Sequence, residues 1–318
     1  MKKAIIVPPS VMEINRVEDN NRILREVLAK EFSFDMLLMD NIDLSLVARY
    51  DLIFIDPFKY LNKKYVVNTM RLLSMPVKIL AYGADIENVK MPEKDFMDFV
   101  RNRSAFYLRA DKILCDVYEN FKVVCADIFE KIKSKMVWWP KCVANYDRYF
   151  NLPFNESPIL KCTLAGKLDD RYALRRFIFE TCGGMVKYYA HPGYGKIDTS
   201  KFPTGDRFAK ELNQYVCGAC PTKVNVNHVT EKHVIIPAAG SLLLTERTAD
   251  FDRLGMTDGV HYVSINRETV SGIIEDVIGS PEKYRDIRFS GREYIKQHHT
   301  IRNRIEEIRP VLKELGDE

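Results

Sequence analysis

Residues 232–246 of the chain read KHVIIPAAGSLLLTE. We expect a short helix that ends in the small-residue turn Ala238-Ala239-Gly240, then a strand over Ser241–Leu244, with Thr245-Glu246 at its carboxyl end. Gly240 has no Cβ, so the backbone there can come close to a ligand. Ligands of open α/β sheets bind outside the carboxyl ends of the strands. The stretch therefore predicts an α/β fold with a ligand site beside it.

Apolar runs that are too short and too continuous for amphipathic helices recur throughout the chain. In the first half they are Ala4–Val7, Met36–Met39, Leu52–Ile55, Val77–Tyr82, Lys112–Cys115 and Met136–Trp139. In the second half they are Ile159–Ala165, Val186–Ala190, Lys223–Val226, Ser241–Leu244 and His261–Ile265. Helical patterns separate these runs, for example over Glu18–Phe32 and Glu119–Ile132. This alternation predicts mostly parallel sheets with right-handed crossovers.

The length of 318 residues suits two domains of about 150 residues each. The segment Asn151–Pro158 (NLPFNESP) is the best candidate for a linker because it is rich in proline and asparagine. We therefore expect an N-terminal domain over residues 1–153 and a C-terminal domain over residues 154–300. A last helix should occupy residues 301–318, with a kink at Pro310. The helix before it should begin at Ser280-Pro281, with the serine as its cap.

The composition is that of a soluble globular protein, with 46% hydrophobic and 29% charged residues. No apolar run approaches the roughly 20 residues of a membrane span, and the start MKKAIIVPPS predicts a first strand and not a signal peptide. The formal charge is only +4 and the signs are interspersed, so nothing requires a nucleic acid as partner. The odd number of seven scattered cysteines predicts reduced, mostly buried thiols and a cytoplasmic location.

The pair Cys217-Gly-Ala-Cys220 has the spacing of a metal or redox site. A structural zinc needs four ligands, and no second cysteine or histidine pair follows at suitable spacing. A thioredoxin-like pair would lie near the first strand of a small domain. Packing thiols are therefore favoured over zinc or redox chemistry, and we expect no metal site.

An anion site is predicted after the strand Ile159–Ala165, where the chain continues as Gly166-Lys167-Leu168-Asp169-Asp170-Arg171. A glycine turn that leads into a helix presents backbone N–H groups and the positive end of the helix dipole. Lys167 and Arg171 would add full charges, and arginine can bind phosphate through two hydrogen bonds. The alternative is that both are solvated residues beside the two aspartates.

Further candidates follow other strands. His191 comes at the end of the next strand, in the tight loop His191-Pro192-Gly193-Tyr194, and can donate to a phosphate or a sugar hydroxyl. It can equally be an ordinary loop residue that packs against Tyr189. In the first half, Asp56 and Asp85 follow strands, and a carboxylate there can act as general base toward a hydroxyl. Aspartate is also a common turn residue.

Several segments between about residues 110 and 305 carry a family resemblance. They are ADKILCDVYENFK with WWPKCVANYDRYF, then LAGKLDDRYALRRFIFE, YYAHPGY, KHVIIPAAGSLLLTE and the tail DGVHYVSINRETVSGIIEDVIGSPEKYRDIRFSGREYIKQHHT. In this order they resemble the two-domain glycosyltransferases of the GT-B type. Within the group 1 family, the nearest match is the branch of the spore-maturation-protein-like enzymes. The first hundred residues agree only in being α/β.

The resemblance implies two Rossmann-like domains with a cleft between them and a kinked last helix that returns to the first domain. The second domain would bind a nucleotide sugar, a UDP- or GDP-sugar. The acceptor would enter from the first domain and be a glycan, a small molecule or a modified nucleic acid. Neither a cofactor nor a metal is implied.

The resemblance also assigns residues of the donor site. Lys167 falls where the family carries a basic residue for the diphosphate, and Arg171 is the nearest substitute for a second one. Gly240 and Ser241 match the small-residue turn against the donor, and Lys232 matches a basic residue just before a family glutamate. The rest of the predicted donor site consists of Gly166, Gly193, Tyr194 and Glu246.

One departure from the family concerns two glutamates. The family usually has one before the PAAG-like turn, often bonded to the ribose, and another eight positions earlier that faces the sugar. This chain has Ile235 and Asn227 there. Either Glu231 or Glu246 replaces the ribose contact, or the donor is held differently, or activity is lost.

The sequence thus predicts a metal-independent glycosyltransferase that moves a sugar from a nucleotide sugar to a hydroxyl. Lys167 and Arg171 would stabilise the leaving diphosphate, and His191 would contact phosphate or sugar. Asp85 would act as base if the anomeric configuration inverts. The competitors are a non-catalytic nucleotide- or glycan-binding protein and a transferase acting on hydroxylated bases of DNA. The latter would use basic residues around Lys59, Lys63 and Lys64. A redox role for Cys217 and Cys220 comes last.

Overall fold

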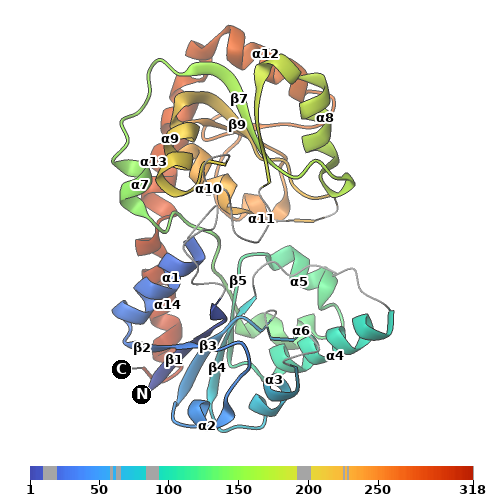
Figure 1. The fold of residues 1–318 in the computed structure, drawn as a ribbon, viewed down its shortest axis with the longest axis vertical. Helices are drawn as coiled ribbons and strands as arrows, with labels where there is room; N and C mark the ends of the chain where they lie inside the picture. Colours follow the sequence, from blue (N-terminus) through green and yellow to red (C-terminus); the bar gives the residue numbers. More distant parts are fainter. Residues whose placement is uncertain are drawn as a thin grey trace. The chain divides into compact units, whose positions relative to one another are not determined.

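The apolar runs form two parallel sheets (Figure 1). The computed structural model describes residues 1–9, 20–57, 60–61, 66–83, 93–191, 202–224, 226–227 and 229–317. The first sheet has the order β2-β1-β3-β4-β5-β6, with β1 (Lys3–Val7), β2 (Phe34–Leu38), β3 (Leu52–Ile55), β4 (Lys78–Gly83), β5 (Lys112–Cys115) and β6 (Met136–Trp138). The second has the order β11-β10-β9-β7-β8, with β7 (Ile159–Gly166), β8 (Val186–Ala190), β9 (Tyr215–Ala219), β10 (Leu242–Thr245) and β11 (Val263–Ser264). The predicted α/β class with two Rossmann-like domains is confirmed.

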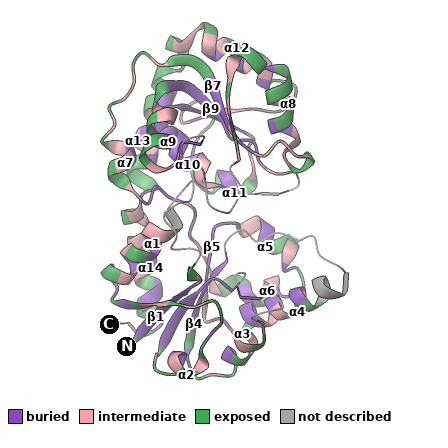
Figure 2. Cartoon of the chain, in the orientation of Figure 1, coloured by how far each residue is buried: buried purple, intermediate pink, exposed green. Residues whose placement is uncertain are grey.

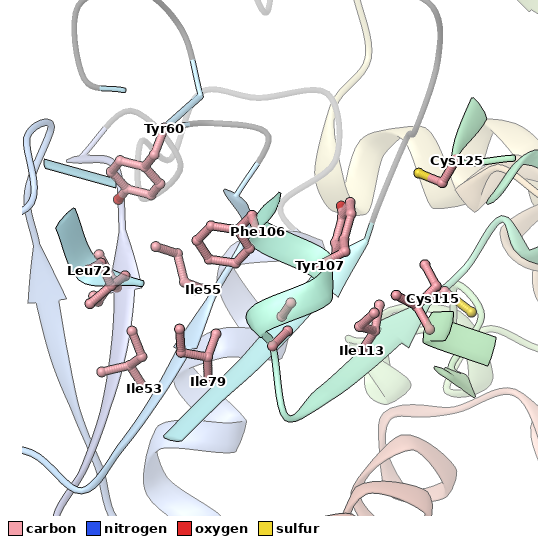
Figure 3. Close-up of a cluster of buried hydrophobic side chains, with 14 of the residues drawn as sticks. Ile53, Ile55, Tyr60, Leu72, Ile79, Phe106, Tyr107, Ile113, Cys115 and Cys125 are labelled. Atoms are coloured by element: carbon pink, nitrogen blue, oxygen red, sulfur yellow. The ribbon is translucent and has the colours of Figure 1, made fainter. Parts of the chain in front are cut away.

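Helices pack on both faces of the first sheet (Figure 1). One face packs against α3 (Val66–Leu72), α4 (Glu93–Arg109), α5 (Tyr118–Val124) and α6 (Phe129–Ile132). Figure 3 shows Leu72, Phe106 and Tyr107 of these helices against isoleucines of the strands. The short helix α2 (Leu44–Val47) adds Val47 to the same core. On the other face, α1 (Asn20–Glu31) and α14 (Ile301–Glu314) are joined by an ion pair between Arg309 and Glu31.

The chain divides into two units. One contains β1, residues Asn21–Pro140 and Arg304–Glu318, and the other contains Lys141–Asn303. Helix α14 therefore packs within the first unit, although it is last in the sequence. Near its end, Lys3 Nζ lies 2.5 Å from Asp317 Oδ2 and Lys78 Nζ donates to the carbonyl of Leu315. At its start, Trp139 Nε1 donates to the carbonyl of Arg304 over 3.0 Å. Pro310 lies inside this helix.

The second sheet is also covered on both faces (Figure 1). One face packs against α8 (Ala173–Thr181) and α12 (Val270–Gly279). The other carries α9 (Gly205–Gln214), α10 (Glu231–Ala238) and α13 (Arg285–His298). The central strands β1, β3, β9 and β10 are buried throughout (Figure 2), and strands of this kind give continuous apolar runs in the sequence. None of the helices in the described parts combines the length and the apolar character that a membrane span requires.

The predicted linker, residues 151–158, belongs to the second unit together with α7 (Tyr146–Phe150). Arginines of α13 hold this segment in place. Arg292 donates to the carbonyl of Leu152, and Arg288 Nη2 donates to the carbonyl of Asn155 over 2.9 Å. Arg285 forms an ion pair with Glu156. Buried guanidinium groups satisfy several carbonyls at once, so a segment that resembles a linker in composition is fixed to the domain that follows it.

Three local predictions are corrected. The strand predicted over Lys223–Val226 is wrong, and the third strand of this sheet is β9, whose sequence YVCGA has a weak strand propensity. The lack of space around Gly218 explains why glycine occupies this position, because an added Cβ would lie 2.7 Å from Thr163 Oγ1 of the neighbouring strand. The helix predicted over Glu119–Ile132 is broken into α5 and α6. Ser280 precedes a 3-10 turn over Pro281–Tyr284 that leads into α13, and Pro281 lies in the first turn as predicted, but the serine side chain makes no capping hydrogen bond.

Candidate functional site

The candidate site lies at the carboxyl ends of β7 and β9. These strands are neighbours in the second sheet, but the chain leaves β7 for β8 on one side and then returns to β9 on the other. Connections that diverge in this way leave a crevice outside the carboxyl ends of the two strands, which is where ligands bind in open α/β sheets. The strand order therefore locates the site before any side chain is considered.

Arg175, from α8, joins the two strand ends. Its side chain is only 4% exposed, and its Nη1 and Nη2 donate to the carbonyls of Lys167 and Pro221 over 3.1 and 3.2 Å. The guanidinium lies 4.0 Å from the ring centroid of Tyr172. Gly166 has a φ of +129°, and a Cβ there would lie 2.5 Å from Arg175 Nη1. The glycine is thus required both by its backbone conformation and by the arginine beside it.

Two lysines and a histidine lie at the same end of the sheet as this buried charge. Lys232, in the first turn of α10, donates from Nζ to the carbonyl of Ala165 over 2.7 Å. Lys167 follows β7, and His191 follows β8. Burial lowers the pKa of His191, and the positive charges of Lys167, Lys232 and Arg175 lower it further. Three positive charges thus act on one imidazole, and a site with this excess of positive charge favours an anionic ligand.

Arg171 is engaged differently from these cations. Its Nη2 lies 2.6 Å from Asp169 Oδ2, and the arginine side chain is 53% exposed. The hydrogen bond from Arg171 lowers the pKa of the Asp169 carboxyl. The positive charge of Arg171, which was predicted to bind a diphosphate, is therefore paired with an aspartate of its own turn. For Arg171 this agrees with the alternative prediction of a solvated residue beside the aspartates.

Gly240 and Ser241 lie at the amino ends of the strands, whereas Lys167 lies at the carboxyl ends. They precede β10, whereas the candidate site follows the strands. Ser241 is buried and donates to the carbonyl of Tyr215, the first residue of β9. Gly240, with a φ of +82°, presents its carbonyl to Arg288. This corrects the expectation that the small-residue turn lies against the ligand, because the turn ends α10 and leads into the amino end of the strand.

The carboxyl ends of β9 and β10 carry a polar network. Thr222 donates from its backbone N and from Oγ1 to Glu246 Oε2, and both distances are 2.9 Å. The buried His233 accepts from the backbone N–H of Thr230 at Nδ1, and its Nε2 lies 3.0 Å from Thr245 Oγ1. A histidine in the third position of a helix is a rare capping residue, so the sequence gave no functional signal for His233. It gave none for Thr222 either.

The remaining candidates are Ile235, the cysteines and several residues that lie outside the described parts of the chain. Ile235 is fully buried in α10 and cannot contact a ligand. All seven cysteines are free and buried, as predicted, and the described residues contain no group of three or more side chains suited to a metal ion. Three predictions fall outside the described residues. They concern Asp85 as base, Gly193 and Tyr194 as donor-site residues, and the basic group Lys59, Lys63 and Lys64.

No family model and no curated protein matches the chain. Solved structures do match, along almost the whole length of the chain. They show that it has the fold of GT-B glycosyltransferases.

HepE from Anabaena, in complex with UDP and glucose, is similar with a TM-score of 0.66 and 10% identity, over 98% of this chain and 99% of that one. The sucrose-phosphate synthase of Thermosynechococcus elongatus gives a TM-score of 0.64 and 12% identity over 99% of both chains. A glycosyltransferase from Rickettsia africae gives 0.56 and 10%, over 99% of this chain and 98% of that one.

Proposed function

We propose that this chain is a glycosyltransferase that binds a nucleotide sugar at the carboxyl edge of its second sheet and transfers the sugar to a hydroxyl acceptor. The observation that carries the proposal is the gathering of positive charge at the carboxyl end of β7, where Arg175 donates to the carbonyl of Lys167 and Lys232 donates to the carbonyl of Ala165. A diphosphate is the group that most naturally fills such a site, because it brings two negative charges and several acceptor oxygens to a small volume.

The proposed reaction breaks the bond between the sugar C1 and the diphosphate oxygen, and forms a bond from C1 to the acceptor oxygen. The acceptor hydroxyl loses its proton, and the leaving diphosphate takes the bonding electron pair. Lys167 and Lys232 would stabilise the charge that develops on the diphosphate, since preorganised cations at a developing charge lower the barrier. Asp85 remains our prediction for the base of an inverting reaction.

We further propose a uridine nucleotide as the donor and no requirement for a divalent metal. The similar HepE structures hold UDP with glucose, or UDP-glucose, which supports the first of these points. Three protein cations at the site support the second. The segments quoted above support a place in the branch of the spore-maturation-protein-like enzymes. Addition of a chelator should leave sugar transfer unchanged.

The test is a thermal-shift panel of UDP, GDP, ADP, CMP and their sugar conjugates, followed by an assay for UDP release from UDP-glucose. A ligand that binds only the folded protein raises its melting temperature by mass action. We expect UDP and UDP-glucose to give the largest shifts. Absence of a shift with every nucleotide would leave the cation cluster without its ligand and remove the basis of the proposal.

His191 should make donor binding depend on pH. Its pKa is lowered in the free protein, and a diphosphate that neutralises the neighbouring cations should raise it. Binding would then take up a proton. Affinity for UDP-glucose should rise as pH falls from about 7.5 to about 5.5, by about tenfold for each unit by which the pKa rises.

UDP-glucose is the right ligand for this measurement, because its diphosphate is esterified at both ends and does not titrate in this range. Calorimetry in two buffers of different ionisation enthalpy measures the proton uptake directly. His191→Gln should abolish the uptake and flatten the profile. A wild-type affinity that is constant or falls toward acid pH would contradict this role of His191.

A further inference from the structure

Two buried cysteines lie side by side in the second sheet. Cys162 of β7 and Cys217 of β9 are partners in the register of these neighbouring strands, so their side chains point to the same face. Both are 0% exposed and belong to the core that α8 and α12 cover. Burial raises the pKa of the Cys217 thiol, and a hydrogen bond with Cys162 raises it further. The proposed sugar transfer uses neither thiol, so the contact between them calls for its own explanation.

The spacing of the two strands suits a disulfide. Neighbouring strands lie about 4.8 Å apart, and the Cα atoms that a disulfide joins are usually about 4.4–6.8 Å apart. The Cβ atoms must approach to about 3.5–4.5 Å, so the bond would draw β7 and β9 slightly together. A bond that holds strands closer than their relaxed spacing is opened readily by reductants. The register of Cys162 and Cys217 therefore provides for a reversible crosslink.

The same geometry separates the two cysteines of the Cys217-Gly-Ala-Cys220 motif. Side chains three positions apart in an extended chain point to opposite faces of a sheet. Cys220 Sγ accordingly lies 3.4 Å from Oγ1 of Thr230, the residue that caps α10, and α10 packs on the other face. The thiol that faces Cys217 is thus on the neighbouring strand and not on its own.

We infer that Cys162 and Cys217 are a redox-sensitive thiol pair, which glutathione disulfide converts to a disulfide between β7 and β9. One cysteine attacks the glutathione disulfide and releases the first glutathione as a thiol. The second cysteine then attacks the mixed disulfide and releases the other glutathione. The two cysteines together lose two protons and two electrons, and the glutathione disulfide gains them as two thiols.

The crosslink joins the two strands that lead to the candidate site. Lys167 and Pro221 follow β7 and β9, and Arg175 donates to the carbonyls of both. The disulfide would hold together, within the sheet, the same strands that Arg175 joins at their carboxyl ends. Oxidation therefore acts on the strand pair that carries the site without occupying the site itself.

The test synthesises the full chain in a cell-free extract buffered with reduced and oxidised glutathione, so that the thiols are accessible before the sheet closes. Free thiols of the folded protein are then alkylated, and trypsin releases Cys162–Lys167 and Glu211–Lys223 as separate peptides. With oxidised glutathione in excess, we expect most molecules to carry these two peptides joined. Fragmentation should place the bond on Cys217, and dithiothreitol should release both thiols.

Cys220→Ala is the matched control, because Cys220 is also buried but lies on the other face of the sheet. It should form the crosslink as the wild type does, whereas Cys162→Ala and Cys217→Ala should each lose it. A bond between Cys217 and Cys220 would overturn the inference, and so would two thiols that stay reduced in excess oxidised glutathione. None of these results depends on the donor site, which the nucleotide panel tests separately.

Discussion

Replacing Lys167 and Lys232 together by alanine should weaken the binding of UDP-glucose by about 100-fold or more. Each lysine would donate a charge-assisted hydrogen bond to the diphosphate, worth about 1.5–3 kcal/mol. Their loss also leaves Arg175 as the only cation of the described cluster, and that arginine already binds two carbonyls. Sugar transfer should fall by more than binding, because the charge on the diphosphate grows as the bond to C1 breaks.

The matched control is the double variant Lys161→Ala, Lys187→Ala. Both of these lysines are exposed residues of β7 and β8, so the control removes the same net charge from neighbouring positions. It should bind UDP-glucose as the wild type does. Lys232 also donates to the carbonyl of Ala165, so melting temperatures must be compared for each variant. Equal losses in the two double variants would mean that the effect is one of overall charge, and the assigned site would be wrong.

Gly291→Ala should destabilise the second unit by about 3 kcal/mol. Gly291 lies within α13, where an added Cβ would be 2.4 Å from the carbonyl oxygen of His261 and 3.6 Å from Cβ of Pro237. The first neighbour is backbone and cannot rotate away, so α13 or the chain at His261 must shift. For a unit of this size, such a loss lowers the melting temperature by about 6–12 °C.

Gly272→Ala is the control for this substitution. Gly272 lies within α12, and apart from its own helix no described residue has an atom within 4 Å of the position that its Cβ would take. Alanine there should stabilise the protein by about 0.5–1 kcal/mol, because glycine is the more flexible residue in the unfolded chain and the poorer one in a helix. Thermal unfolding of both variants measures the contrast. Similar effects of the two substitutions would refute the close packing of α13.

Much of the fold could be predicted from the sequence, because strands buried on both faces give continuous apolar runs. The runs around Ile5, Phe54 and Leu243 are of this kind and do form strands. The strand YVCGA escaped prediction because Gly218 is required by its close approach to Thr163, although glycine has a low strand propensity.

The candidate site could be predicted only in part. Lys167 and His191 could be predicted as candidates because each follows an apolar run, and the carboxyl ends of parallel strands lie at the same side of a sheet. Gly240 was misplaced, since a sequence motif does not reveal which edge of the sheet it faces. Arg175 and Thr222 act through contacts with Pro221 and Glu246, and those contacts exist only after the strands have been assembled.

The placement of α14 has a consequence for biosynthesis. Most of the second unit is one continuous stretch of the chain, Lys141–Asn303, which is translated in one piece. The first unit needs residues Arg304–Glu318, which are translated after the whole of the second. At about 5–20 residues per second the wait lasts on the order of ten seconds or more. During that time the face of the first sheet that packs against α1 lacks α14, so the half of the protein that is made first is completed last.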